Sequence, residues 1–541
     1  MAGCLKIAAI IVFYASFAAA LEFPSAYYAK GHIYLPYGDI AEPFEAWVDM
    51  KSGKSRMDTY NGTSKIINRQ DEGNYGMMYK IVPVTTESVA NKISCFKLGG
   101  FKGVPVVPQG VLPNATLYKY VTDMEYEGLK VSVYISYFTD NDRSNNYTLL
   151  IRKDNSHPVV LHFLGYDRLF GSHYDEYDIV YTDFMASTPD PSVFEIQKGF
   201  QCGAFPGPGA NNPMSENPLF ELVGARSYSH IEQQSRVAAE FELFAKKHGK
   251  QYTHQKEFSQ KHASFAKNFR YINAMNRQNL TYKLAVNHMA DYSEVDFRTL
   301  RGVIKTSDSL RQDVVQKSKK SLPLQWDWRL QGAVTPVKDQ GICGSCWSFG
   351  TTGTLEGSLF IKHNKLISLS EQCLVDCSWG FGNNGCDGGE SERAYEWIMK
   401  SECLPTESSY GQYLMQDGFC RVNESECGVQ ITNWHNTPQG NVQALVEAIY
   451  NNGPISVAID ASHLSFAFYS HGVYFEPKCG STPDDLDHQV LAVGYGDLEE
   501  IPYILVKNSW STHWGNDGYI LMSQKDNNCG IATDASYADV I

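Results

Sequence analysis

Hydrophobic and polar residues alternate in short runs along the first 220 residues. Segments rich in Tyr, Val, Ile and Phe lie at 32–35, 44–48, 131–138 and 148–152. Such segments are typical of half-buried strands, and turn-forming residues such as Asn61-Gly62 separate them. The pattern predicts an all-β antiparallel domain over residues 21–220. Its apolar face is covered either by the sheet itself or by a ligand.

The pattern changes to a helical period between residues 236 and 300. Six residues at steps of 4, 4, 3, 4 and 4 share one helix face: Glu257, Lys261, Phe265, Asn268, Ile272 and Asn276. Residues 301–321 are polar and basic and predict an exposed, cleavable connector. A stretch rich in Pro, Gly and Asn at 206–213 predicts a boundary before the helical region.

From residue 322 the sequence becomes rich in Trp, Gly, Cys and Tyr. Residues 343–363 predict a helix, because Cys346, Phe349, Thr352 and Leu355 share a face. Residues 489–495 and 503–507 predict strands with glycine-rich turns. We expect residues 322–541 to form a domain of their own.

Residues 1–20 combine one lysine, an apolar run and small residues at Ala18 and Ala20. This predicts a secretory signal peptide cleaved after Ala20. No later stretch of the sequence is long and apolar enough to span a bilayer. Five sequons agree with secretion and are candidate glycosylation sites: Asn61, Asn114, Asn146, Asn279 and Asn423.

The last two regions of the sequence have opposite net charges. The 541-residue chain has a net charge of −14 and lacks the basic footprint of a nucleic-acid-binding protein. Residues 236–321 carry 17 Lys and Arg against 8 Asp and Glu, a net +9, whereas residues 322–541 carry 10 against 27, a net −17. Either these are unrelated solvated surfaces, or the basic segment binds the acidic domain.

The cysteines indicate an oxidising compartment. Cys4 lies in the predicted signal peptide. Cys95 and Cys202 are the other cysteines of the N-terminal half and predict a staple of the β domain, and ten more lie from Cys343 to Cys529. The pair at 343 and 346 has three interpretations. A zinc site needs a second ligand pair, and a redox pair needs a thioredoxin-like βαβ context; the sequence contains neither. The third interpretation is one bridged cysteine beside a nucleophilic thiol at the start of a helix.

Four motifs, in order, resemble the papain and cathepsin L family of cysteine proteases: QGICGSCW at 340–347, CSWGFGNNGCDGG at 377–389, DHQVLAVGYG at 487–496 and NSWSTHWG at 508–515. The resemblance covers residues 236–541. It implies an α+β papain-like fold of two lobes, one helical and one β-barrel-like, preceded by a helical propeptide at 236–300. It also implies an endopeptidase that acts on protein and peptide substrates through a thioester and needs neither cofactor nor metal.

The resemblance implies a role for each residue at the matching positions. Cys346 resembles the nucleophile, and His488 resembles its base and later acid. Asn508 resembles the residue that orients His488, and Gln340 the side chain that stabilises the oxyanion with the Cys346 backbone N–H. Trp510 is expected to shield the His488–Asn508 contact from water.

The family's substrate cleft implies a specificity hypothesis. Gly388 and Gly389 would offer backbone hydrogen bonds to an extended peptide. The second subsite would be lined by Glu390, Ala458, Leu486, Gln489 and Asp534. Two carboxyl groups there favour a basic P2 side chain, unless one or both point to solvent. The expected substrate-binding set is completed by Asp487, Trp510 and Trp514.

The family's disulfides imply three pairs in the last domain, with Cys346 free: Cys343–Cys386, Cys377–Cys420 and Cys479–Cys529. Cys373, Cys403 and Cys427 depart from the family's pattern. Two of these three could form a further bridge, which would leave one odd thiol.

The preceding segment resembles an inhibitory propeptide. Residues 257–276 resemble the interspersed prosegment motif of the cathepsin L group, with Lys261 in place of Arg. Residues 285–291 resemble its second motif, with Ala285 and Met289 in place of Gly and Phe. The protein's own propeptide would then be an inhibitory partner, released by cleavage near 320–322. If charge helps to hold it, activation should quicken below about pH 5 and with added salt.

The resemblance leaves residues 21–220 unexplained. A β extension before such a zymogen resembles the two-chain cathepsin-like proteases of insects and related proteases of amoebae, which implies a retained non-covalent subunit. A targeting or ligand-binding module and a folding or inhibitory aid are the alternatives. The rival hypothesis for the whole protein is a catalytically silent secreted binding or adhesion protein. The family resemblance and the acidic charge of the last domain favour a lysosome or secretory granule as the destination. Extracellular release is the alternative.

Overall fold

The structure is a computed structural model of the chain. It describes residues 21–86, 89–140, 143–167, 172–197, 199–204, 219, 222–223, 229–304, 311, 313–314 and 321–541. The predicted signal peptide, the boundary stretch 206–213 and the basic residues 315–320 lie outside the described residues. The described parts of Met1–Tyr79, Lys97–Gly199 and Gly203–Gln234 form one compact unit. Those of Lys80–Phe96, Phe200–Cys202 and Ser235–Ile541 form a second.

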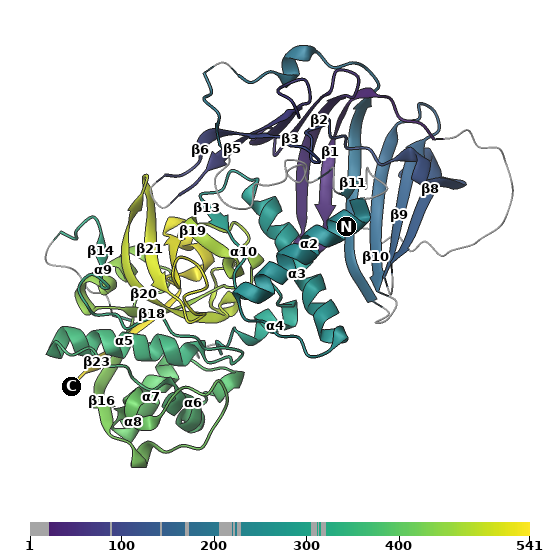
Figure 1. The fold of residues 1–541 in the computed structure, drawn as a ribbon. Coiled ribbons are helices and arrows are strands. Elements are labelled where there is room, and N and C mark those ends of the chain that lie inside the picture. Colours follow the sequence, from purple (N-terminus) through teal and green to yellow (C-terminus); the bar gives the residue numbers. More distant parts are fainter. Residues whose placement is uncertain are drawn as a thin grey trace. The chain divides into compact units, whose positions relative to one another are not determined.

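The N-terminal region is built around one large sheet (Figure 1). Among the described residues its twelve strands lie in the order β12-β6-β5-β4-β3-β2-β1-β11-β10-β9-β8-β7. Neighbours pair antiparallel from β1 to β4 and from β7 to β11, and β1 pairs antiparallel with β11 to join the two halves. The all-β prediction is confirmed.

The strands are β1 (Ala26–Leu35), β2 (Ile40–Asp49), β3 (Lys54–Thr59), β4 (Ser64–Arg69), β5 (Met77–Val84), β6 (Lys92–Gly99), β7 (Lys119–Tyr126), β8 (Leu129–Asp140), β9 (Arg143–Arg152), β10 (Pro158–Asp167), β11 (Ser172–Met185) and β12 (Gly203–Ala204). The four segments predicted from the sequence lie within β1, β2, β8 and β9.

One face of this sheet carries the core. Buried and less buried residues alternate along β1 and β2, as period-2 strands require. Part of the face is covered by the chain itself: the Val111 N–H donates to the Tyr27 hydroxyl at 2.9 Å, and the Tyr181 hydroxyl donates to the Val111 carbonyl at 2.7 Å. The disulfide Cys95–Cys202 joins β6 to the residue before β12, its neighbour in the sheet.

The next elements are α2 (Ser229–Lys247), α3 (Gln255–Asn276), β13 (Tyr282–Leu284) and α4 (Glu294–Thr299). The predicted helix face lies on α3, and its two asparagines hold the following loop in place. Asn268 Nδ2 donates to the carbonyls of Ala290 and Tyr292, both at 3.0 Å, and Asn276 donates to the Leu284 carbonyl at 2.8 Å. β13 pairs with β19 and so adds a strand to the sheet of the last domain.

The last domain has two lobes. The helical lobe contains α5 (Cys346–His363), α6 (Glu371–Cys377), α7 (Ser391–Ser401) and α8 (Glu407–Tyr410), packed around Trp347, Leu374, Tyr395 and Trp434. In Figure 1, α5 runs between α6–α8 and the strands of the other lobe. The predicted two-lobed papain-like fold is confirmed.

The sheet lobe is ordered β13-β19-β22-β21-β20-β18-β23-β17 among the described residues, with β14 beside β20. Its remaining elements are β14 (Trp326–Asp327), β17 (Ile431–Asn436), α9 (Val442–Asn452), β18 (Ile455–Ile459), α10 (Leu464–Ala467), β19 (Tyr469–Tyr474), β20 (His488–Leu498), β21 (Ile501–Lys507), β22 (Tyr519–Ser523) and β23 (Asp534–Val540). A short hairpin of β15 (Leu404–Pro405) and β16 (Cys427–Val429) lies apart from this sheet.

One predicted boundary differs from the structure. The helix predicted from residue 343 begins at Cys346. Cys343 is bonded to Cys386, and Ser345 has non-helical backbone angles (φ −101°, ψ 16°), so the chain enters the helix only after this turn. The predicted strands 489–495 and 503–507 lie within β20 and β21.

Candidate active site

Cys346 is the first residue of α5, and its side chain is fully buried. The disulfide Cys343–Cys386 and a 2.9 Å hydrogen bond from the Gly344 N–H to the Cys386 carbonyl hold the turn before the helix. A helix N-terminus carries a partial positive charge. This position therefore favours a thiolate once the site is opened to substrate.

His488 is the first residue of β20 and is also fully buried. Its Nε2 lies 2.8 Å from Oδ1 of Asn508, the residue that follows β21. An amide oxygen accepts hydrogen bonds, so Nε2 carries the proton of this contact and the neutral ring has its lone pair on Nδ1. Among the described residues, Nδ1 is buried without a hydrogen-bond partner, which leaves it able to accept a proton.

Aromatic rings enclose the contact between His488 and Asn508. The ring centroid of Trp510 lies 4.7 Å from that of His488, and Trp514 and Phe466 lie 5.6 and 5.4 Å from Trp510. Trp514 donates its Nε1–H to the Phe466 carbonyl at 3.1 Å, which fixes the group. These rings exclude water from the imidazole, so its hydrogen bond to Asn508 acts in a low-dielectric surrounding.

Burial keeps both members of this pair neutral in the precursor. It raises the pKa of the Cys346 thiol to about 11, although backbone hydrogen bonds from Gln489, Gly302 and Trp347 oppose the rise. Burial also lowers the pKa of His488 to about 4; the Asn508 hydrogen bond opposes this, and the positive charge of Arg301 adds to it. A thiolate–imidazolium pair therefore requires that the covering segment leave.

The side chain of Gln340 donates hydrogen bonds to carbonyl groups in the precursor. Its Nε2 donates to the carbonyls of Leu300 at 2.9 Å and of Cys343 at 2.8 Å, while its Oε1 accepts from the Ser509 hydroxyl at 2.7 Å. Leu300 belongs to the segment that follows α4, outside the last domain. A carbonyl of the precursor thus occupies a donor suited to an oxyanion.

The same segment continues past Cys346. Gly389 donates its N–H to Gly302 at 2.8 Å and accepts from the Ile304 N–H at 3.0 Å, in a parallel bridge with Val303. A Cβ atom at residue 302 would overlap the carbonyl oxygen of Gly344, so only glycine fits there. Arg301 Nη1 forms an ion pair with Asp487 at 3.3 Å. The segment covers the thiol and uses the backbone groups expected to bind substrate.

Strand register brings the predicted subsite residues together. Asp534 on β23 pairs with Ala458 on β18, and Ala458 pairs with Gln489 on β20, so the three form one row across the sheet. The carboxyl group of Glu390 faces this row, within 4.8 Å of that of Asp534. Both carboxyls are buried, at 1% and 9% exposure, so neither points to solvent. The buried Leu486 directly precedes Asp487 and His488.

Two regions of the sequence match known protein families. Residues 322–539 match the papain family cysteine protease domain, and residues 241–297 match the cathepsin propeptide inhibitor domain (I29). Digestive cysteine proteinase 2 of Homarus americanus is 44% identical over 304 residues, which cover 55% of this chain and 93% of that protein. The chain belongs to the papain family of cysteine proteases.

Two further relatives place this papain-family protease in the cathepsin L-like group. A cathepsin L-like peptidase of Aedes aegypti is 48% identical over 268 residues, covering 47% of this chain and 78% of that protein. Among solved structures, digestive procathepsin L 3 of Tenebrio molitor larval midgut is 38% identical with a TM-score of 0.51, covering 56% of this chain and 99% of that one. The chain is therefore a cathepsin L-like zymogen with its own inhibitory propeptide.

The structure of the protease pairs its cysteines as Cys343–Cys386, Cys377–Cys420 and Cys479–Cys529 in the last domain. It also joins Cys403, directly before β15, to Cys427 of β16, a pairing that the sequence left open. Cys346 and Cys373 are the free cysteines among the described residues, and both are buried.

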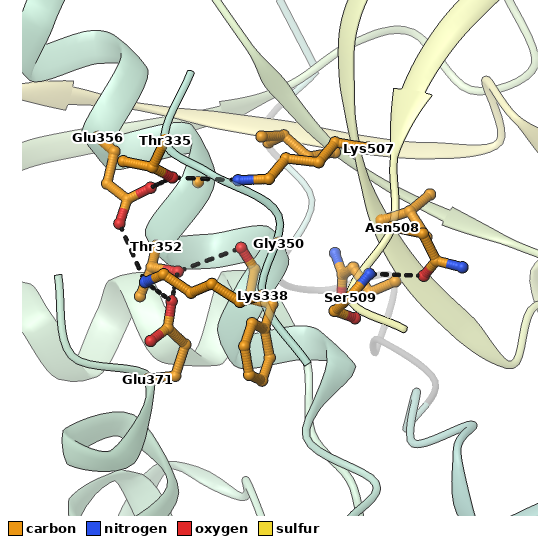
Figure 2. Close-up of a pocket in the computed structure, with 14 residues that line it drawn as sticks. Thr335, Lys338, Gly350, Thr352, Glu356, Glu371, Lys507, Asn508 and Ser509 are labelled. Carbon is orange, nitrogen blue, oxygen red and sulfur yellow. Dashed lines mark hydrogen bonds and ion pairs between the residues drawn. The ribbon is translucent and has the colours of Figure 1, made fainter. Parts of the chain in front are cut away.

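A buried network of charges adjoins Asn508 (Figure 2). It lines a small cavity between α5 and strands β20 and β21. Lys338 Nζ lies 2.5 Å from Glu371 and 3.5 Å from Glu356, and these two carboxylates raise its pKa although burial opposes the rise. Lys507, directly before Asn508, donates to the Thr335 hydroxyl at 3.1 Å, and Thr335 donates to Glu356 at 2.6 Å. The network ties the Asn508 backbone to α5.

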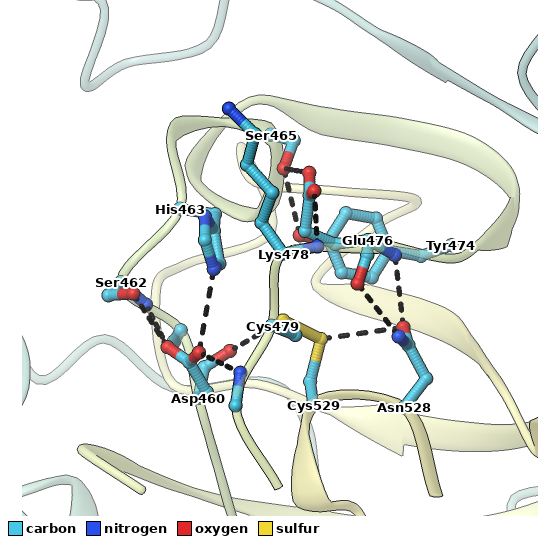
Figure 3. The surroundings of a disulfide bond; sticks show 12 residues. Asp460, Ser462, His463, Ser465, Tyr474, Glu476, Lys478, Cys479, Asn528 and Cys529 are labelled. Carbon is cyan, nitrogen blue, oxygen red and sulfur yellow. Dashed lines mark hydrogen bonds and ion pairs between the residues drawn. A yellow bond between two sulfur atoms is a disulfide. The ribbon is translucent and has the colours of Figure 1, made fainter. Parts of the chain in front are cut away.

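The disulfide Cys479–Cys529 lies beside the loop that follows β18, where the Asp460 N–H donates to the Cys529 carbonyl at 2.9 Å (Figure 3). Next to it, Asp460 accepts hydrogen bonds from the Gly480 and Ser462 backbones at 2.8 and 3.0 Å, and lies 3.4 Å from His463 Nε2. Although burial opposes them, these contacts lower the pKa of Asp460 to about 2. Asp460 directly follows β18, whose last residue pairs with His488, so the loop is fixed beside the imidazole.

Two groups of side chains have the spacing of metal ligands within the described ranges. The ligand atoms of each group lie within 4.8 Å of one another: Asp460, His463 and Cys479, and Glu390, Glu392 and Asp534. Cys479 is in a disulfide and Asp460 is already hydrogen-bonded as above, so the first group does not present three free ligands. In the second group, Asp534 and Glu390 form ion pairs with Arg311 and Arg393.

Several site residues were not predicted. Ser509 holds the Gln340 oxygen, Phe466 packs against Trp510, and Arg301 pairs with Asp487. Ser509 lies inside a recognised motif and could have been named from it. Phe466 and Arg301 reach the site through tertiary packing and carry no local signal.

The predicted sequons lie in different surroundings. Asn61, Asn279 and Asn423 are exposed, and Asn114 is half-buried. Asn146 lies within β9, and its Oδ1 is buried. No helix in the described part of the chain combines the length and apolar character needed to cross a membrane.

Proposed function

We propose that the protein is an endopeptidase made as a zymogen, with Cys346, His488, Asn508 and Gln340 as its catalytic residues. The observation that carries this proposal is the Gln340–Leu300 hydrogen bond, beside the buried His488–Asn508 pair. The precursor's own carbonyl occupies the oxyanion donor next to Cys346. A substrate carbonyl would take its place once the prosegment has left.

The reaction follows from these positions. The Cys346 sulfur attacks the substrate carbonyl carbon as its proton passes to His488 Nδ1, and Gln340 Nε2 and the Cys346 N–H stabilise the oxyanion. The C–N bond then breaks, the amine leaves with the proton from His488, and a thioester remains. Water, deprotonated by His488, attacks the thioester; the C–S bond breaks, the carboxylic acid product leaves, and the proton on His488 passes to the Cys346 sulfur. Asn508 keeps the imidazole oriented throughout.

We propose a basic P2 preference, because Glu390 and Asp534 are both buried beside the row of Ala458 and Gln489. Gly388 and Gly389 would bind the substrate backbone once the prosegment strand has left. Asp487 and Leu486 would border the cleft beside His488.

We propose passage through the secretory pathway to a lysosome, granule or extracellular space. Five disulfides among the described residues support an oxidising route. The names of the relatives, which include digestive proteinases of Homarus americanus, support an enzyme that degrades proteins.

The N-terminal β region is proposed to remain with the enzyme as a non-covalent subunit. Residues Lys80–Phe96 group with the protease in one compact unit. Within that unit, His471 Nε2 lies 2.8 Å from the Thr85 carbonyl, and the Ala90 N–H donates to Glu499 at 2.6 Å. His471 also pairs with Lys283 of prosegment strand β13, whereas Glu499 lies in the turn between β20 and β21, so the Ala90–Glu499 hydrogen bond is the contact that prosegment removal would leave in place.

The test is acid activation of the purified precursor under reducing conditions at about pH 4.5, near the ordinary pKa of carboxyl groups. Hydrolysis of a fluorogenic peptide is followed with and without a thiol-directed epoxide. We expect activity that the epoxide abolishes and that Cys346→Ala lacks, and co-elution of the N-terminal region with the enzyme on a sizing column. Cys373→Ala is the matched control, because its thiol is buried away from the site.

Absence of peptide hydrolysis from pH 4 to 7 after the prosegment has been removed would contradict the proposal. The silent binding or adhesion protein would then be the better account. Elution of the N-terminal region apart from an active enzyme would contradict only the subunit proposal.

A further inference from the structure

Three carboxyl groups meet in one buried site beside the substrate cleft. Glu390 and Glu392 come from the start of α7, and Asp534 from the start of β23; the oxygens of all three lie within 4.8 Å of one another. Glu390 and Glu392 are each 1% exposed. Oε1 of Glu390 and Oε2 of Glu392 are buried without a hydrogen-bond partner among the described residues, and Oε2 of Glu390 has only the ion pair with Arg393 described below.

Three carboxyl groups this close together ionise only when cations lie beside them. Burial, then the neighbouring carboxyls, raises the pKa of both Glu390 and Glu392. Two guanidinium groups face the three carboxyls. Arg393 of α7 lies 3.3 Å from Glu390, and Arg311 of the connector lies 3.1 Å from Asp534. Asn436 also donates to Glu392 at 3.0 Å.

Arg311 is held in the site by more than charge. Its guanidinium donates to the carbonyls of Thr437 and Thr533 at 3.1 and 3.4 Å and to Asp313 at 2.9 Å, and its side chain is only 13% exposed. Asp313 forms a parallel bridge with Asn436, and the Val314 N–H donates to the Asn436 carbonyl at 2.9 Å. The described connector residues 311, 313 and 314 therefore bind the protease at the rim of the acidic site.

Removal of the connector leaves three carboxyls with one guanidinium. We propose that Glu392 is a third specificity-determining residue of the second subsite, and that Arg311 occupies this acidic site in the precursor in place of a substrate's basic side chain. This inference rests on the proposed peptidase function and deepens it. The site selects substrates with arginine or lysine at P2, and the connector blocks it until the chain is cleaved.

The first test uses mature enzyme and two peptides that differ only in Arg or Leu at P2. Glu392→Gln keeps the volume and removes the charge, so we expect the ratio of kcat/KM for Arg over Leu to fall about tenfold, the effect of one charge-assisted hydrogen bond. Asp534→Asn should lower the same ratio, which guards against a folding defect of one variant. Exposed Glu426→Gln is the matched control and leaves the ratio unchanged.

The second test uses the full precursor. Arg311→Gln should shorten the half-time of acid processing severalfold, whereas Arg298→Gln, an exposed basic residue of α4, should not. An unchanged Arg/Leu ratio in both Glu392→Gln and Asp534→Asn would overturn the specificity assignment, and an unchanged half-time in Arg311→Gln would overturn its role in the precursor. If the wild-type mature enzyme cleaved neither peptide, the proposed function itself would fail.

Discussion

Single residues decide whether the thiol can react. Gln340 illustrates this, because its amide serves two partners at once: Nε2 donates to Leu300 and Oε1 accepts from Ser509. The Ser509 contact fixes the amide's orientation before any substrate arrives. A preoriented donor stabilises the developing oxyanion without reorganising during the reaction.

We therefore expect Gln340→Ala to lower kcat by about 10²- to 10³-fold, with a smaller change in KM, as measured by steady-state peptide hydrolysis. The loss should appear mainly in kcat because the donor acts on charge that develops in the transition state. Gln443→Ala, at an exposed position on α9, is the control. A loss of only a few fold in kcat would remove Gln340 from the catalytic set.

Among secondary-structure elements, the critical junction joins α5 and α6 to β21. Lys338 is the centre of this junction, because it meets Glu371 at 2.5 Å, Glu356 at 3.5 Å and the Leu369 carbonyl at 3.4 Å. Both carboxyl groups are only 2% exposed. The junction fixes the position of Asn508 relative to α5, because the preceding residue, Lys507, joins the same network through Thr335.

Replacing Lys338 by Met would leave two buried carboxyls without their cation. We expect the free energy of unfolding at neutral pH to fall by about 3 kcal/mol, as for other broken buried ion pairs. Denaturant unfolding of the Cys346→Ala precursor measures it, with exposed Lys365→Met as control. The deficit should shrink at acidic pH, because burial raises the pKa of Glu371 and protonation then removes the unpaired charge.

For the molecule as a whole, the decisive feature is how the prosegment is held and released. A region of net charge +9 precedes a domain of net charge −17, and its described part contacts that domain. At their contact three imidazoles meet: the ring centroids of His248 and His288 lie 5.6 and 6.0 Å from that of His513. His248 Nε2 and His288 Nδ1 are buried without a hydrogen-bond partner in the described structure, so an added proton would lack an acceptor.

This cluster predicts a pH dependence. Burial, then nearby Lys247 for His248 and Lys250 for His288, lowers the pKa of His248 to about 4 and that of His288 to about 3; the negative charge of Asp291 opposes the shift at His248. An imidazole whose pKa falls when the prosegment binds stabilises the bound state at pH values above its ordinary pKa of about 6.5. That preference is lost as the pH falls toward 4.

We expect the double variant His248→Gln and His288→Gln to need a lower pH for processing, by about one unit, because two of the titrating groups are gone. The half-time of prosegment loss measured from pH 4 to 7 tests this, with His254→Gln, an exposed position before α3, as control. A pH profile identical to that of the wild type would show that carboxyl titration alone drives release. Added salt should quicken processing of both proteins, because it screens the opposite net charges.

Much of this protein could be inferred from its sequence, because the relevant information is local. The strands of the β region, the α3 face and the helix after Cys346 follow from periodicity over a few residues. Cys346, His488, Asn508 and Gln340 were named from contiguous motifs. The basic and acidic regions needed only a count of charges.

Other features required the tertiary structure, because they depend on contacts between distant positions. Asp534, Ala458 and Gln489 form one row only through the register of three strands. Glu392 joins Glu390 because the first turn of α7 brings both carboxyls against β23, and Arg311 reaches them by crossing from the connector. Likewise, the Cys403–Cys427 pairing and the meeting of His513 with two prosegment imidazoles are set by packing between segments, which leaves no pattern along the chain.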